Sequence, residues 1–537
     1  MKFLFTISIL FASFFAFAQA GAIDKTYGKN GFFSQKSTEP SLDFPTQKSV
    51  LQADNKLLYL EENQDELTKI LSTNVIRLTA AGAIDKTFGN NGVLTMSIPN
   101  TDVVLAALTM QSDGKILLTG FSYKEDTTSS ELQILIFRLN SNGSLDGTFG
   151  TSGKIEIGQS NVTDAAFSIK SIKDGKILIG GVISDNPNSN DAILVRLNAN
   201  GTIDTTFGNQ GSYRHTEISD IPLKYCFNID LDKSGNIFMV GQGINGTSSE
   251  SKGFLTKINA NGTLDKTFGN NGSIEIGDDN ADDIVFLENL KVQADGKIVV
   301  LKRIILADET NITRIIRYLP TGKEDPTFGN SGVVTMNLAT DNQALANDLL
   351  LQSDGKILVN AINYNVNNGA FKNSTIRYDS KGKIDNVFGI QGSATTESDS
   401  IDYYSANILM ASDGKIIVSA IGQNFNSNQY YQTTFRLLNP EVTATENITA
   451  ANNLAIFPNP TQSDFVLSYS LEEAQNNISI NLVNMEGKII TTLLTNVTGN
   501  AGKQTEHIHL NENITSGVYF LKIKTDKGIS QVKIVKM

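Results

Sequence analysis

The sequence predicts an all-β protein: a seven-bladed β-propeller of four-stranded blades, followed by a small C-terminal β-sandwich. Three observations lead to this fold class. One motif recurs seven times, its copies lie about 60 residues apart, and short apolar runs alternate with turns rich in Gly and Asn between the copies. Helical spacing of apolar residues is absent throughout the repeated region, which argues against any mixed α/β architecture.

The repeated motif reads GAIDKTYGKNG at Gly21 and GKIDNVFGIQG at Gly382, with five further copies between them. A glycine follows the aromatic residue in every copy, at Gly28, Gly89, Gly150, Gly208, Gly269, Gly329 and Gly389. The spacings between these glycines are 61, 61, 58, 61, 60 and 60 residues. Such regular spacing indicates one supersecondary unit per copy.

Two further elements complete each unit. A turn motif such as QSDGK at Gln111 lies between the copies, and an apolar run ending in a basic residue follows it. These basic residues are Arg77, Arg138, Arg196, Lys257, Arg317, Arg377 and Arg436. In the second full unit we expect strands at 105–111, 115–120, 132–139 and 154–157, joined by turns containing Gly114 and Gly143.

The two ends of the repeated region are complementary. The first copy of the motif has no strands before it, and the last unit, which ends at Leu438, has no motif copy after it. Pairing the two ends gives seven complete blades and closes the ring, which leaves no exposed sheet edge. A β-solenoid, the main alternative, needs no such pairing. Closure predicts that Asp24 meets Arg436 as Asp146 meets Arg138.

The units resemble the delta-60 family of bacterial repeats, which carries the same Ile/Leu-Asp-x-Thr/Ser/Val-Phe-Gly core. The resemblance covers residues 21–438. It implies repeat architecture and export rather than a particular chemistry.

The repeated side chains have mainly structural interpretations. The motif aromatics (Tyr27, Phe88, Phe149, Phe207, Phe268, Phe328 and Phe388) are expected to pack between blades. The motif aspartates (Asp24, Asp85, Asp146, Asp204, Asp265, Asp325 and Asp385) could ligate Ca²⁺ or pair with the basic residue that ends the third strand. We favour the pairing, because Ca²⁺ needs 6–8 oxygen ligands and each unit offers one such carboxylate. The single cysteine, Cys226, lies in an apolar run and reads as a buried small hydrophobe.

The loops that differ among the units all emerge on one face of the predicted propeller, which makes it the candidate binding face. An acidic residue recurs there before the first strand of each unit, where a ring of charge could attract a cation or basic ligand, or could simply cap loops. These residues are Asp43, Asp102, Asp164, Asp220, Asp283, Asp341 and Asp402. Tyr403, Tyr404, Tyr430 and Tyr431 add aromatic surface on the last unit, for stacking on a glycan or for packing the closing blade.

The N-terminal residues 1–20 have the pattern of a signal peptide. Lys2 precedes an apolar run at 3–17, and Ala18-Gln19-Ala20 forms a small-x-small site, so we expect cleavage near Ala20. The run is too short for a transmembrane helix, and no other long apolar run follows. A buried N-terminal strand or helix is the alternative.

Residues 439–453 read as a polar linker, and 454–537 as a separate domain with strands at 465–469, 478–483, 488–494, 518–523 and 531–535. This stretch resembles the type A sorting domain of the type IX secretion system of Bacteroidetes. The matching residues are Phe457-Pro458-Asn459-Pro460, Glu486-Gly487-Lys488, Gly517-Val518-Tyr519 and the basic end at 533–537. The resemblance implies passage across the outer membrane and a partner in the secretion machinery. His507 and His509 read as ordinary strand residues rather than a zinc site.

The sequence leaves three functions open: a secreted or cell-surface module for binding or adhesion, a propeller-type polysaccharide lyase or hydrolase, and a structural surface protein. We prefer the first, because polar groups are distributed by repetition and no catalytic constellation is visible. The net charge of −12 argues against nucleic acid as a partner. No cofactor is evident, Ca²⁺ has weak support, and a glycan or surface protein is the candidate ligand.

Overall fold

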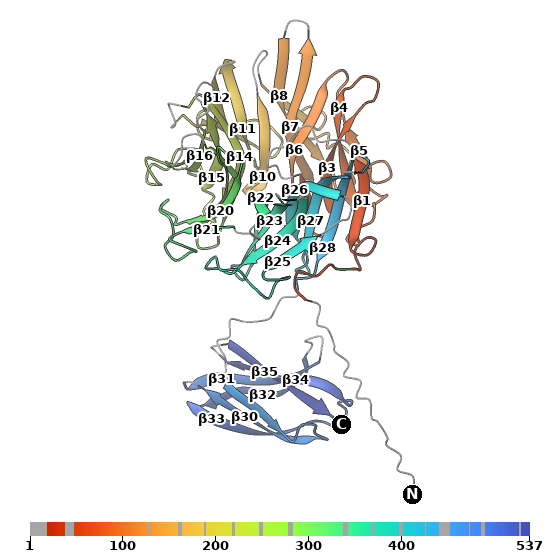
Figure 1. Ribbon diagram of the computed structural model, residues 1–537, viewed down its shortest axis with the longest axis vertical. Coiled ribbons are helices and arrows are strands. Elements are labelled where there is room, and N and C mark those ends of the chain that lie inside the picture. Colours follow the sequence, from red (N-terminus) through yellow and green to blue (C-terminus); the bar gives the residue numbers. More distant parts are fainter. Residues whose placement is uncertain are drawn as a thin grey trace. The chain divides into compact units, whose positions relative to one another are not determined.

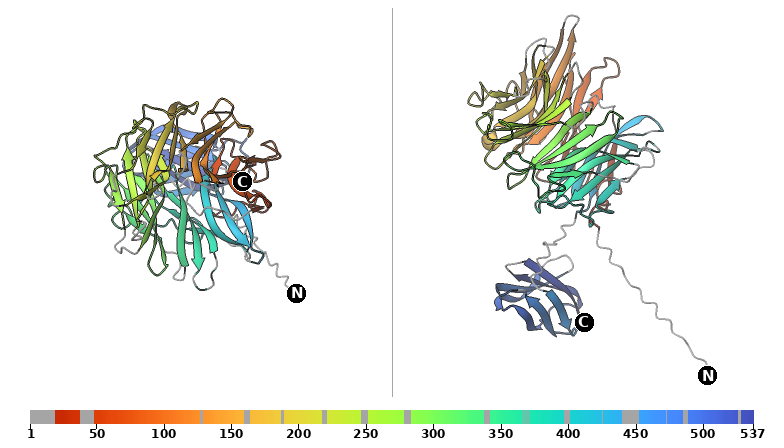
Figure 2. Two further views of the ribbon diagram at one scale, coloured as in Figure 1. Left: turned by 90° about the horizontal axis from the view of Figure 1, so that it is seen from above. Right: turned by 60° about the vertical axis from the view of Figure 1, so that its left-hand side comes forward.

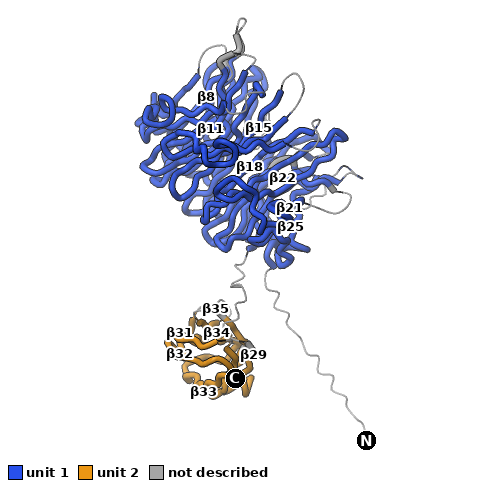
Figure 3. Tube along the Cα trace, turned by 90° about the vertical axis from the view of Figure 1, so that its left-hand side faces the viewer, with its two compact units in different colours: residues 1–440 blue, residues 441–537 orange. Residues whose placement is uncertain are grey.

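The computed structural model describes residues 19–37, 48–126, 129–158, 164–186, 189–216, 221–245, 251–277, 283–336, 342–365, 367, 369, 371–396, 401–424, 426–439, 452–471, 473–484, 489–525 and 528–537. The chain divides into two compact units, Met1–Pro440 and Glu441–Met537 (Figure 3). Each unit is described by itself below.

The first unit consists of short strands. In chain order they are β1 (Phe32–Ser37), β2 (Ser49–Leu51), β3 (Leu57–Gln64), β4 (Leu71–Leu78), β5 (Val93–Met96), β6 (Asp102–Met110), β7 (Ile116–Asp126), β8 (Ser129–Leu139), β9 (Lys154–Ile157), β10 (Ala165–Ser171), β11 (Ile177–Asn186), β12 (Ser189–Leu197), β13 (Ser212–Arg214), β14 (Leu223–Leu231), β15 (Ile237–Ile244), β16 (Ser251–Ile258), β17 (Ser273–Ile276), β18 (Ile284–Val292), β19 (Ile298–Ile305), β20 (Asn311–Tyr318), β21 (Val333–Thr335), β22 (Asn342–Leu351), β23 (Ile357–Asn365), β24 (Phe371–Tyr378), β25 (Ser393–Thr396), β26 (Ile401–Met410), β27 (Ile416–Asn424) and β28 (Gln429–Leu437). A single 3₁₀ turn, Lys173–Gly175, interrupts this pattern in the described part of the unit.

These strands form antiparallel sets of four (Figure 1). The sets are β2–β5, β6–β9, β10–β13, β14–β17, β18–β21, β22–β25, and β26–β28 completed by β1. One parallel bridge, between Asn190 and Leu223, joins the third and fourth of these sets into a larger sheet. The all-β fold and its four-stranded sheets are therefore confirmed.

The first strand of each set lies innermost. Each contacts the first strand of the next set, from β2 through β6, β10, β14, β18, β22 and β26, and β26 in turn contacts β2. Seen from above in Figure 2, the sheets stand side by side around a common centre. This is the arrangement of propeller blades.

The end of the repeated region pairs with its beginning. Strand β1 is antiparallel to β28, with Phe32 opposite Phe435 and Ser37 opposite Tyr430. The Tyr27 hydroxyl lies 2.9 Å from Thr434 Oγ1, so the only tyrosine among the motif aromatics makes a contact across this junction. The strand that the last unit lacks is thus supplied by the residues that follow the first motif copy.

Strand lengths differ from the expected ones mainly at one end of the blades. Strand β9 has the bounds expected from the sequence, whereas β7 and β8 run on to Asp126 and Ser129, into residues expected to form a loop. The sequence of this segment, KEDTTSSE at 124–131, is polar throughout, so composition alone did not distinguish a two-stranded extension from a loop. A register shift also occurs in the innermost strands, as between Ala166 and Ser168.

The second unit is a two-sheet sandwich. Its strands are β29 (Asn452–Phe457), β30 (Asp464–Leu471), β31 (Gln475–Val483), β32 (Ile489–Gly499), β33 (Gly502–His509), β34 (Gly517–Thr525) and β35 (Gly528–Lys536). One sheet has the order β29-β30-β33 and the other β32-β31-β34-β35. Leu467, Ile480 and Leu521 are buried in the core that the two sheets share.

The five strands expected in this unit are present, and two strands were not foreseen. Strand β29 overlaps the expected linker, and β33 contains His507 and His509. The histidines are thus strand residues, as expected, and His509 Nδ1 lies 2.8 Å from Asp464 Oδ1 on the neighbouring strand. Glu486, Gly487 and Lys488, which are part of the resemblance to the sorting domain, lie outside the described residues.

Within the described residues, no helix has both the length and the apolar character that crossing a membrane requires.

The glycine after each motif aromatic is required by the backbone. Gly150 has φ +52°, and a Cβ placed there would lie 2.4 Å from the carbonyl oxygen of Lys154. Gly114, in the turn between β6 and β7, also has a positive φ of +83°, but a Cβ there would meet nothing within 4 Å. An added Cβ would cause only backbone strain at Gly114, but both backbone strain and steric overlap at Gly150.

We expect Gly114→Ala to lower the free energy of unfolding by about 1 kcal/mol, the cost of a left-handed backbone in an L-residue. Gly150→Ala should lower it by roughly 3 kcal/mol, because the backbone must also move to relieve the overlap. Denaturant unfolding of the two variants measures both values. Equal effects would contradict the close approach at Gly150.

Candidate binding face

The four-stranded sets give the first unit two faces. We call the variable face the end that carries the connections between second and third strands, such as β7–β8, and between a fourth strand and the next first strand. We call the constant face the opposite end, which carries the connections between first and second strands and between third and fourth strands. In Figure 1 the β7–β8 hairpin projects from the variable face, and the two ends of the unit leave from the constant face.

Three repeated side chains meet near the constant face, at the motif aspartate. Asp146 Oδ2 accepts from Arg138 Nε at 2.7 Å and lies 2.8 Å from Lys115 Nζ. Asp146 Oδ1 accepts from the Thr148 backbone N–H at 3.1 Å and from its hydroxyl at 2.7 Å. Lys115 comes from the turn motif, Arg138 is the second-last residue of β8, and Thr148 belongs to the repeated motif with Asp146, so all three sequence signatures meet in one cluster.

The same cluster joins the two ends of the unit. Arg436 Nε donates to Asp24 Oδ2 at 2.8 Å, and Lys415 Nζ lies 3.1 Å from the same oxygen. The pairing of Asp24 with Arg436 is thus confirmed. Equivalent clusters form at Asp85 with Arg77 and Lys56, Asp204 with Arg196 and Lys176, Asp325 with Arg317 and Lys297, and Asp385 with Arg377 and Lys356.

The arginine of each cluster also links neighbouring blades. The Arg317 guanidinium lies over the Phe328 ring at 4.5 Å, and its Nη1 donates to the Ser380 carbonyl oxygen of the next unit at 2.5 Å. All seven motif aromatics are at most 1% exposed, which confirms that they are core residues. A buried ring stabilises through its apolar area, and a guanidinium over its face adds a cation–π attraction.

The fourth unit departs from this pattern in a consistent way. Lys257 stands where the others have arginine, and its Nζ lies 2.9 Å from Asp265 Oδ2. Asn236 stands where the others have the turn lysine, and it donates instead to Asp232 Oδ2 at 2.8 Å. At this cluster a single lysine side chain therefore pairs with the motif carboxylate, in place of an arginine and a lysine.

The clusters around Asp24 and Asp146 hold these two carboxylates in the charged form. Burial opposes ionisation of Asp24, but hydrogen bonds from Thr26 and the charges of Lys415 and Arg436 lower its pKa to about 2. At Asp146 the hydrogen bond from Lys115 is the largest cause of a lowered pKa. Among the described residues, no three His, Cys, Asp or Glu side chains gather in an arrangement that could hold a metal ion.

On the variable face, the recurring acids cap backbone groups. Asp102 Oδ1 accepts from the Leu71 N–H at 2.7 Å and Asp402 Oδ1 from the Phe371 N–H at 3.0 Å, in each case at the start of a strand of the preceding blade. Asp164 and Asp283 accept from Ser184 and Ala307, at or beside the second strands of their own blades. Asp43, Asp220 and Asp341 lie outside the described residues.

Two of these acids do not form part of an open ring of charge. Asp164 is 1% exposed and Asp283 is 6% exposed, because the hairpins that they cap fold over them. For these two residues, burial favours the alternative of loop capping over a ring of charge around a channel mouth. The innermost strands also bring the rings of Phe167 and Phe227 together at 5.9 Å between centroids, and both rings are buried.

The tyrosines of the last unit differ in their burial. Tyr403 is 2% exposed, and burial raises its pKa to about 12, so it belongs to the core and not to a binding surface. Tyr430 and Tyr431 are half-buried on β28, opposite Ser37 and Lys36 of β1. Tyr404 lies on β26, and its side chain falls outside the described residues.

Sequence reasoning missed a set of half-buried aromatic residues next to the variable loops: Tyr123, Tyr225, Phe286, Tyr364 and Phe371. The Tyr364 and Phe371 rings lie 4.7 Å apart across the β23–β24 hairpin, and the Arg303 guanidinium lies 4.4 Å over the Phe286 ring. These residues have no counterpart at the same place in every unit. The one sequence feature that could have identified them is their position beside loops that differ among the units.

A cluster of ion pairs adds polar chemistry to this face. Asp191 lies 3.0 Å from Arg214 Nη2 and 3.3 Å from Lys224 Nζ, where the third and fourth blades meet. Nearby, Asn190 Nδ2 donates to the Tyr225 hydroxyl at 3.1 Å. Cys226 is fully buried, as expected, and burial raises its thiol pKa.

Two family models match parts of the chain. Residues 455–537 match the model described as "Secretion system C-terminal sorting domain". Residues 111–149 and 173–207 match the model described as "Domain of unknown function (DUF5122) beta-propeller". No curated protein matches the chain.

Solved structures give distant matches. A chain of the crystal structure of the mitotic checkpoint complex is 11% identical, with 81% of this chain and 99% of that chain covered and a TM-score of 0.40. A protein of unknown function from Dyadobacter fermentans is 12% identical (64% and 100% covered, TM-score 0.35), and an endo-arabinase from Bacteroides thetaiotaomicron is 10% identical (50% and 92% covered, TM-score 0.28). At these TM-scores the matches carry no argument about function.

The lowered pKa of Asp24 predicts a pH dependence of stability. An unfolded aspartate has a pKa of about 3.9, so the stabilisation from charged Asp24 is complete above roughly pH 4 and is lost as the pH falls through 2. Asp24→Asn should lower the thermal midpoint at pH 7 and reduce its further fall between pH 4 and pH 2.

The matched control is Asp113→Asn, an exposed aspartate of a constant-face turn. It should leave the midpoint within about 1 °C of the wild type. Thermal unfolding followed by circular dichroism across this pH range checks both variants. An Asp24→Asn profile parallel to that of the wild type would contradict a structural role for this carboxylate.

Proposed function

Because the chain is a β-propeller of the delta-60 type with a type IX secretion sorting domain, we propose that it is a binding or adhesion module that acts outside the cell. The sorting domain at 455–537 implies delivery to the outer surface or the medium and contact with the secretion machinery. We assign ligand binding to the variable face, and a glycan or surface protein is the ligand class that fits it.

The distribution of side chains between the two faces carries this proposal. Near the constant face, the repeated Asp, Arg and Lys residues satisfy one another in structural clusters. Beside the variable loops, half-buried aromatic rings lie next to ion pairs and polar loops. Aromatic rings with polar neighbours favour sugar stacking and protein interfaces, because they combine apolar area with hydrogen-bonding groups.

Export by this route also needs passage across the inner membrane. We assign that step to residues 1–20, whose charged start, apolar run and small-x-small site form a signal peptide with cleavage near Ala20. Residues 1–18 lie outside the described part of the chain, so the assignment rests on their sequence.

The binding proposal is tested with the exported protein on arrays of glycans and host surface polysaccharides, with and without Ca²⁺. The variant Tyr364→Ala/Phe371→Ala removes two adjacent rings of the variable face. We expect it to weaken the binding of an identified ligand at least tenfold, about 1.4 kcal/mol.

The matched control is Lys86→Ala, an exposed residue of a constant-face turn, which should bind as the wild type does. Loss of binding in both variants, or in neither, would contradict a site around these rings. Release of sugar from a polysaccharide on the array would instead favour the lyase or hydrolase alternative.

The export assignment predicts that a chain ending at Asn439 will remain inside the cell envelope. Its repeated unit is intact, so it should be found in the soluble periplasmic fraction, whereas the full chain reaches the surface or medium. Cell fractionation followed by immunoblotting measures this. The control His507→Ala, an exposed strand residue of the sorting domain, should be exported normally. Normal export of the truncated chain would overturn the assignment.

A further inference from the structure

The junction between the two ends of the repeated unit rebuilds a turn that is continuous elsewhere. In the first complete blade, β2–β5, the Thr79 N–H donates to the Ala83 carbonyl at 2.7 Å and the Gly82 N–H donates to the Thr79 carbonyl at 2.9 Å. At the junction, the Leu438 N–H donates to the Ala22 carbonyl at 2.7 Å and the Gly21 N–H donates to the Leu438 carbonyl at 2.6 Å. Leu438 thus takes the place of Thr79, and residues 20–22 take the place of residues 81–83.

Ala20 completes a hydrogen bond that recurs at every boundary between blades. The glycine after each motif aromatic donates its N–H to the residue just before the next motif copy. The pairs are Gly28 to Ala81, Gly89 to Asn142, Gly150 to Asn200, Gly208 to Asn261, Gly269 to Thr321, Gly329 to Lys381, and Gly389 to Ala20. The last of these is 2.6 Å long, and the other six are 2.7–3.0 Å.

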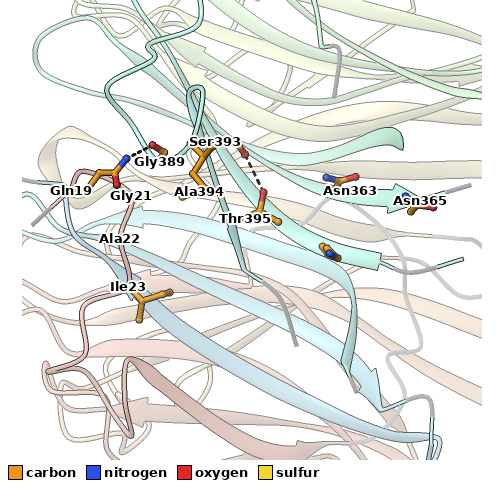
Figure 4. Close-up of a pocket in the computed structure, with 12 residues that line it drawn as sticks. Gln19, Gly21, Ala22, Ile23, Asn363, Asn365, Gly389, Ser393, Ala394 and Thr395 are labelled. Atoms are coloured by element: carbon orange, nitrogen blue, oxygen red, sulfur yellow. Dashed lines mark hydrogen bonds between the residues drawn. The ribbon is translucent and has the colours of Figure 1, made fainter. Parts of the chain in front are cut away.

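Gln19 and Ala20 both contact the rest of this junction, and Figure 4 shows Gln19 beside Gly389. Ala20 is 5% exposed and belongs to the apolar core of the last blade with Phe388 and Leu437. The Gln19 side-chain amide donates to the Gly389 carbonyl, and the Gln19 carbonyl accepts from the Ala22 N–H at 2.9 Å. Both residues therefore make the contacts of folded propeller residues.

The groove beside Gln19 has a counterpart at another blade boundary, so we do not assign a ligand to it. It has a volume of about 690 Å³ and is lined in part by Gly21, Gly389 and Ser393. A groove of about 510 Å³ occupies the same place between the first and second complete blades, beside Gly89 and Gly143. At the junction, Gln19 contributes to one wall of this groove.

Cleavage after Ala20 would remove these contacts. The Gly389 N–H would lose its acceptor, and the core would lose the Ala20 methyl group. A second small-x-small site, Ala16-Phe17-Ala18, lies two residues earlier and would leave Gln19 and Ala20 on the mature chain.

We propose that the signal peptide is cleaved after Ala18, so that the mature chain begins at Gln19. The reaction is hydrolysis of the Ala18–Gln19 peptide bond: water supplies the oxygen of the new Ala18 carboxylate, and the amino group remains on Gln19. This inference rests on the proposed export through a signal peptide and replaces the site after Ala20. The mature chain then begins with Gln19 and Ala20, the two residues that complete the rebuilt turn at the junction.

The direct test is mass spectrometry of the exported full chain after digestion at lysine and arginine. The expected N-terminal peptide runs from Gln19 to Lys25, and a peptide from Gly21 to Lys25 would overturn the proposal. Retention of residues 1–18 in the exported protein would instead contradict the signal peptide itself, so the two failures are distinguishable.

Two matched variants test the same site by blocking it. Ala16→Gln places a large residue at the third position before the proposed cut and lies outside the alternative site. Ala20→Gln instead places a large residue immediately before the alternative cut and lies outside the proposed site, Ala16-Phe17-Ala18. We expect precursor to accumulate at least tenfold with Ala16→Gln and processing between residues 18 and 19 to continue with Ala20→Gln. Normal processing of Ala16→Gln, or a block with Ala20→Gln alone, would overturn the proposal.

Discussion

The propeller depends on one interaction, the motif carboxylate that an arginine and a lysine share in every blade except the fourth unit's. Such a carboxylate is costly to bury unless its charge is paired and its oxygens are hydrogen-bonded. Both conditions are met, because the motif threonine binds one oxygen and the cations bind the other. The arginine then reaches the next unit and covers the motif ring, so the cluster fixes the blade and its neighbour together.

This shared cluster explains why the sequence repeats where it does. Residues that are separated along the chain meet at one place in each cluster. They are the Asp, the Thr and the aromatic ring of the motif, the lysine of the turn, and the basic residue near the end of the third strand. A change in one of them leaves a buried charge without its partner. The fourth unit shows the tolerated form of change, in which a lysine replaces the arginine and the turn asparagine bonds locally.

The repeated part of the molecule could be predicted from the sequence because each motif position can be compared across seven copies. The core role of the motif aromatics, the Asp24–Arg436 pair and the burial of Cys226 are confirmed. The unrepeated parts could not be predicted in this way. Asp164, Asp283 and Tyr403 looked like surface residues, but hairpins and neighbouring strands cover them. Strand β33 was missed because its segment is largely polar, and strand β29 because its apolar residues, 454–457, form only a short run at the end of the expected linker.

The pairing of β1 with β28 has a consequence for the order of synthesis. The first strand of the ring leaves the ribosome before every other strand, yet its partner is the last of the unit to follow. Asp24 and Arg436 are 412 residues apart in the chain, so the final contact is among the most non-local that the unit can make. Contacts of this separation form late and slowly. The ring therefore cannot close around a partly synthesised chain, and closure itself marks the moment at which the whole repeated unit has become available for folding.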